Sequence, residues 1–98
     1  MKRQDFVRQL AMMLRDLPVG TTADLNDCMV AYWNGYSVVF AFLGERGTGV
    51  VEEEFDIDDY VWDDWRPTFE NWVSQPVFSS RPEVKQWLID APPHEAGA

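Results

Sequence analysis

Residues 28–43 decide the fold, and they read CMVAYWNGYSVVFAFL. Apolar, aromatic and β-branched side chains fill both halves of this stretch, and the dipeptide Asn34-Gly35 separates them. Both central residues of a type I′ turn need positive φ, which Asn and Gly tolerate. The stretch therefore predicts a β-hairpin with a two-residue loop.

A two-residue loop also predicts the register of the hairpin. We expect Trp33 opposite Tyr36 and Met29 opposite Phe40, because side chains alternate between the two faces of a strand. The face that carries the larger side chains, and that we expect to cover the core, then comprises Met29, Ala31, Trp33, Tyr36, Val38, Phe40 and Phe42.

A third strand is expected at residues 50–57, after a loop with three glycines at residues 44–49. If Leu43 pairs with Val50, alternation places Glu52, Glu54 and Asp56 in one row on the face away from the core. On the core face we then expect Val51, Phe55 and Ile57. Glu53 also falls on the core face in this register, which requires an open edge or a β-bulge at that position.

Helical periodicity flanks the strands. Residues 6–17 repeat apolar side chains every three or four positions, which predicts one buried helical face; these side chains are Phe6, Val7, Leu10, Met13, Leu14 and Leu17. From residue 58 onward we expect a short turn capped by Asp58 or Asp59, and a second helical piece that begins near Pro67 and ends at Pro76. A capping box at residues 80–83 predicts a last helix.

These elements predict an α+β domain at residues 1–90 and a flexible tail at residues 91–98. The expected order is α-β-β-β-α-α: an N-terminal helix, a three-stranded antiparallel meander, and two or three short helices on one face of the sheet. In topology this order resembles the double-stranded-RNA-binding domain. Those domains grip phosphates with a basic helix start, whereas residues 58–66 here carry four acids and one Arg.

Charge and composition exclude several functions. The chain has 17 acidic and 8 basic residues, a net charge of −9, so direct binding to nucleic acid or to an anionic membrane is not expected. One cysteine, Cys28, allows no internal disulfide and fits a reducing compartment. No apolar run is long enough for a membrane span, and we expect a cytoplasmic protein.

The acidic residues are concentrated in one segment. Residues 52–64 hold eight carboxylates and no Lys, Arg or His, and residues 1–50 hold five acids and five bases. Such a segment suits a basic partner, although acids on an edge strand also prevent unwanted strand pairing. Because Tyr60 and Trp62 stand among the acids, at least one of them is expected near the surface as an aromatic anchor. The predicted partner-binding residues are Glu52, Glu54, Asp56, Asp58, Asp59, Trp62, Asp63 and Asp64.

Metal binding and catalysis find less support in the sequence. Asp56 and Asp58 could begin an EF-hand loop, but Tyr60 and Val61 occupy its third ligand and glycine positions. The one histidine, His94, lies in a Pro-flanked tail. We therefore predict no catalytic residue, no metal site and no cofactor.

Size, charge and the lack of catalytic residues resemble phage-encoded anti-defence inhibitors, such as anti-CRISPR proteins. This resemblance implies a small non-catalytic inhibitor that binds the basic, nucleic-acid-binding surface of a larger protein. The alternative is an immunity or antitoxin-like protein that neutralises a basic enzyme, or a small subunit of a cellular assembly. The sequence leaves the identity of the partner and the oligomeric state open.

Overall fold

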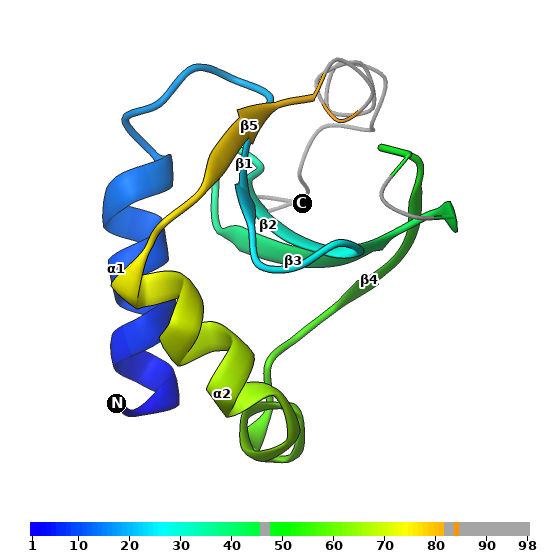
Figure 1. Cartoon of the computed structure of the whole chain (residues 1–98). Coiled ribbons are helices and arrows are strands. Elements are labelled where there is room, and N and C mark those ends of the chain that lie inside the picture. The colour runs from blue at the N-terminus through cyan, green and yellow to red at the C-terminus, as the bar shows by residue number, and fades with distance from the viewer. Residues whose placement is uncertain (46–47, 82–83, 85–98) are drawn as a thin grey trace, which may run out of the picture.

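Residues 28–43 form the predicted antiparallel hairpin in a computed structural model, which describes residues 1–45, 48–81 and 84. Its strands are β2 (Met29–Trp33) and β3 (Val38–Leu43) (Figure 1). Trp33 pairs with Val38 and Met29 pairs with Phe42, so the register differs by two residues from the prediction. A shift of two keeps the side chains of the paired residues on their expected faces, because strand alternation has a period of two.

The register differs because the loop has four residues, 34–37, rather than two. The Asn34 side-chain oxygen accepts hydrogen bonds from the backbone N–H groups of Tyr36 at 2.8 Å and Ser37 at 2.7 Å. Gly35 takes the positive φ, at +93°. The predicted two-residue loop is therefore wrong: the Asn34 side chain closes a wider turn, and Tyr36 leaves the strand and is exposed.

The sheet has five strands in the described part of the chain. In addition to the hairpin it contains β1 (Thr21–Asp24), β4 (Val51–Phe55) and β5 (Phe78–Ser80), in the spatial order β4-β3-β2-β1-β5, with every neighbouring pair antiparallel. The α+β class is confirmed. The three predicted strands pair as β2-β3-β4, the expected antiparallel meander. Because β1 and β5 extend the sheet, the predicted order α-β-β-β-α-α and the expected topological likeness to the double-stranded-RNA-binding domain are wrong. Both added strands are too short and too polar to show an alternating pattern.

A β-bulge interrupts the pairing of β3 with β4. Phe42 lies opposite Glu53, but the next residue, Leu43, lies opposite Val51, so Glu52 is the extra residue. Val51 consequently packs on the sheet face away from the helices, not on the face that we predicted. Glu53 lies on the helix side at the edge strand, where it is exposed.

The helices α1 (Arg3–Leu14) and α2 (Asp59–Ser74) lie together on one side of the sheet (Figure 1). The two short pieces that we predicted around Pro67 are one helix. Pro67 is exposed and lies inside α2, which changes direction along its length in Figure 1, as expected for a proline kink. The helix continues past the proline because the buried side chains before and after it lie on the same face of the helix. These side chains are Trp62, Phe69 and Trp72.

The core is divided between the two faces of the sheet. On the helix side, Phe6 and Leu10 of α1 pack with Phe40 of β3 and with the buried face of α2. The opposite face buries a smaller cluster, which consists of Val30, Tyr32, Ala41, Leu43 and Val84.

The second edge of the sheet is held by polar contacts. Thr22 is fully buried, and its hydroxyl lies 3.0 Å from Asp24 Oδ1 and 2.9 Å from Ser79 Oγ. Arg81 Nη2 donates to the same Asp24 oxygen at 3.2 Å. The Thr22–Ser79 bond connects β1 to β5, and the Arg81–Asp24 bond connects the residue after β5 to β1. This three-residue strand is therefore fixed in place by side chains as well as by its ladder.

The predicted last helix lies outside the described residues except at Ser80, Arg81 and Val84. Ser80, the first residue of the expected capping box, ends strand β5. The boundary at residue 90 and the tail at residues 91–98 also lie outside the described part.

Replacing Phe6 with Ala tests the core of the helix side. Phe6 has no exposed surface, so we expect the variant to lose about 3–5 kcal/mol of unfolding free energy in urea denaturation. Met12→Ala on the same helix is the control, because Met12 is 59% exposed and its truncation should change stability by no more than about 0.5 kcal/mol. Equal losses in the two variants would contradict this description of the core.

Candidate functional site

All eight carboxylates of residues 52–64 are exposed, and we call them the acidic surface. They begin on the edge strand β4, continue through the connection after it, and end in the second turn of α2. The acidic surface comprises Glu52, Glu53, Glu54, Asp56, Asp58, Asp59, Asp63 and Asp64. It includes seven of the eight predicted partner-binding residues and adds Glu53.

On β4 the carboxylates do not form the straight row that the sequence predicted. Glu53 lies opposite Phe42 and Glu54 lies opposite Ala41, so these two point to opposite faces of the sheet. Glu52 is the residue added by the bulge. Negative charge therefore borders the edge strand on both of its faces.

At the start of α2 the carboxylates differ in role. The Asp58 side chain accepts a hydrogen bond from the Val61 backbone N–H at 2.9 Å and caps the helix. Asp59 and Asp63 are one turn apart on the helix surface, where like charges repel. In the described residues, one cation contacts the acidic surface: Arg3 Nε lies 3.8 Å from Asp59 Oδ1.

The aromatic residue exposed within the acidic surface is Tyr60, not Trp62. Tyr60 is 81% exposed, whereas Trp62 is 7% exposed and stacks on Phe69 at 5.5 Å between ring centroids. The prediction of Trp62 as a partner-binding residue is corrected, because the helical phase of α2 turns it into the core. Tyr60 meets the expectation of one aromatic near the surface.

Glu54 connects the acidic surface to the smaller buried cluster on the sheet face away from the helices. The Tyr32 hydroxyl donates to Glu54 Oε1 at 3.3 Å. Burial raises the pKa of the Tyr32 hydroxyl far above its ordinary value, and the charge of Glu54 and this hydrogen bond raise it further. Tyr32 is thus a hydrogen-bond donor that stays protonated in the folded protein.

The described residues contain no group of three or more His, Cys, Asp or Glu side chains arranged to hold a metal ion. Cys28 is a half-buried free thiol, and His94 lies outside the described part. In that part, neither helix is long and apolar enough to cross a bilayer. Comparison with known proteins finds no matching family model, no matching curated protein and no matching solved structure.

Within the acidic surface, neutralising the carboxylate that caps α2 should lower the stability of the fold, whereas neutralising carboxylates that repel one another should raise it. Asp58→Ala removes the α2 cap and should lower stability by about 1 kcal/mol. Asp63→Asn with Asp64→Asn relieves like-charge repulsion and should raise the melting temperature, by less in high salt than in low salt. Thermal unfolding at two salt concentrations measures both effects. A lower melting temperature for the Asp63/Asp64 variant would show that these acids stabilise the fold.

Alkaline titration should isolate the buried tyrosine. The chain has three tyrosines, so a variant with Tyr36→Phe and Tyr60→Phe retains Tyr32 alone. The unfolded chain loses the Tyr32 proton near pH 10 and the folded chain keeps it, so stability should fall as the pH rises above about 10. Ultraviolet absorbance should show phenolate only when circular dichroism shows unfolding. Phenolate in the folded protein at pH 10 would contradict this assignment.

Proposed function

We propose that the acidic surface binds a basic, nucleic-acid-binding surface of a larger protein and that the chain acts as a non-catalytic inhibitor, as anti-CRISPR proteins do. The observation that carries this proposal is the exposure of all eight carboxylates of residues 52–64. Among described residues, seven of them have no ion-pair partner. Exposed charge without a local counter-charge is available to an external cation.

The charge spacing on β4 supports mimicry of nucleic acid. Successive residues of a strand rise by about 3.3 Å, close to the spacing of about 3.4 Å between charges along one strand of duplex DNA. Glu52, Glu53 and Glu54 are consecutive and all exposed, but Glu53 and Glu54 point to opposite faces, so each face carries about half that density. The carboxylates that follow on the connection and on α2 add to this field, which a groove lined with Lys and Arg for a phosphate backbone would meet.

Tyr60 gives the acidic surface an additional contact for such a partner. It lies one helical turn before Asp64 and one residue after Asp59, with most of its ring in solvent. An Arg guanidinium can stack on the ring of a tyrosine while it pairs with a neighbouring carboxylate. The combination favours an Arg-rich partner over a Lys-rich one.

The proposal is tested by competition for a nucleic-acid-binding partner captured from host lysate. The chain should displace nucleic acid from that partner, and a variant with Asp56, Asp63 and Asp64 changed to Asn should do so at least tenfold less effectively, with a weaker dependence on salt. The matched control changes Asp16 and Asp27 to Asn and Glu45 to Gln. It removes the same charge from exposed positions outside the acidic surface and should behave like the parent.

Equal loss in both variants would show that net charge, not the acidic surface, drives binding. Capture of an enzyme whose activity needs no nucleic acid, inhibited through the same residues, would replace this proposal with the immunity-protein alternative.

A further inference from the structure

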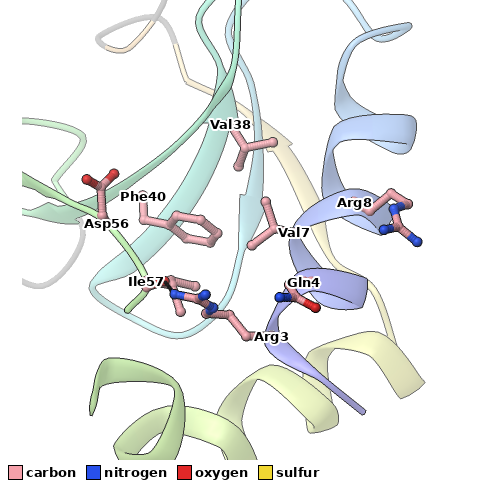
Figure 2. Close-up of a pocket in the computed structure, with 8 residues that line it drawn as sticks. All are labelled: Arg3, Gln4, Val7, Arg8, Val38, Phe40, Asp56 and Ile57. Atoms are coloured by element: carbon pink, nitrogen blue, oxygen red, sulfur yellow. Dashed lines mark hydrogen bonds between the residues drawn. The ribbon is translucent and has the colours of Figure 1, made fainter. Parts of the chain in front are cut away.

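An apolar groove of about 470 Å³ lies between α1 and the sheet (Figure 2). Val7 of α1 faces Val38 and Phe40 of β3 across it, and Ile57 lies at its lower end in the view. The Arg3 Nη1 group donates to the Ile57 carbonyl at 2.9 Å, which holds the segment after β4 against α1. The groove is therefore formed before any ligand binds, as is usual for binding sites of this size.

The groove is continuous with the acidic surface. Asp56, on its rim, belongs to the acidic surface, and its carboxylate points away from the groove in Figure 2. Ile57, the next residue, contributes to the floor. A chain that placed one side chain in the groove would bring its neighbouring residues next to Asp56. A second hollow, at the end of α1 by Leu17 and Trp33, has no lining residue from the acidic surface.

We propose that this groove receives a bulky apolar side chain of the basic partner, with Lys or Arg residues beside it that pair with Asp56 and the rest of the acidic surface. This inference rests on the proposed function. Surface charges mainly steer association, whereas a buried apolar or aromatic anchor supplies much of the affinity of an interface. The acidic surface, which reaches the groove at Asp56, selects a cationic segment as the carrier of that anchor.

The guanidinium groups near the groove do not favour an anionic ligand instead. Arg3 is committed to the Ile57 carbonyl and to Asp59. Arg8 turns away from the groove in Figure 2, and its Nη1 atom lies 3.7 Å from Asp5 Oδ1. Both arginines line the groove, but their guanidinium groups already have partners, so the apolar floor and the adjoining acidic surface define the chemistry of the occupant.

Two peptides test the inference: acetyl-Lys-Arg-Phe-Lys-Arg-amide and the same peptide with Ala in place of Phe. Each is titrated into ¹⁵N-labelled protein at low salt and followed by amide chemical shifts. We expect the Phe peptide to bind about fivefold more tightly, because part of its ring surface is removed from water. The amides of Val7, Val38 and Ile57 should shift with the Phe peptide and not with the Ala peptide.

Gln4→Trp should fill the groove from its exposed wall and abolish the preference for Phe. Gln9→Trp is the matched control, because Gln9 is exposed on the same helix and does not line the groove. Circular dichroism checks that both variants fold.

The outcomes separate this inference from the proposed function. Equal binding of the two peptides, or a preference that survives Gln4→Trp, would overturn the groove as an anchor site and leave cation binding intact. Failure of both peptides to bind the parent protein would overturn the acidic surface as a binding site for cations, and the groove proposal with it.

Discussion

The ring of Phe6 holds both helices to the sheet. Its centroid lies 6.4 Å from that of Phe40 on β3, and 4.9 Å and 5.7 Å from those of Phe69 and Trp62 on α2. Aromatic pairs at these separations attract beyond the effect of area burial alone. Because Trp62 must reach Phe6, the rotation of α2 about its axis is determined, and Tyr60, Asp63 and Asp64 are left facing solvent. The core thus dictates which carboxylates of the helix are available to a partner.

The long periodic segments were predictable from the sequence. The α1 stripe as far as Leu14 and the faces of the paired hairpin strands follow from side-chain spacing alone. Leu17, which was predicted on the same stripe, lies beyond the helix and is exposed. The hairpin register was not predictable, because a two-residue and a four-residue loop at Asn34-Gly35 place the strand side chains on the same faces. Only the hydrogen bonds from the Tyr36 and Ser37 N–H groups to the Asn34 side chain distinguish the two loops. Strands β1 and β5 have four and three residues. They depend on ladder bonds and on the buried hydroxyl of Thr22, neither of which gives a sequence pattern.

The candidate site was predictable in its charge and less so in its geometry. Eight acids in thirteen residues exceed what a core can bury, so their exposure follows from composition. The inward position of Trp62 had a signal that was available: with Trp65, Phe69 and Trp72 it repeats at intervals of three and four residues. Pro67 obscured that repeat by suggesting a helix break. The groove could not be predicted, because its residues come from three separate segments of the chain.

The bulge at Glu52 reverses the alternation of side chains between the two faces along β4. Val51 and Phe55 are four residues apart, an even separation that would place both on one face of a regular strand, yet they pack on opposite faces of the sheet. A relative with one residue fewer here would need no bulge, because Val51 and Phe55 would then be three residues apart, an odd separation that places them on opposite faces of a regular strand. The bulge therefore keeps both layers of the core in register around an extra residue, and that residue adds one carboxylate to the edge strand.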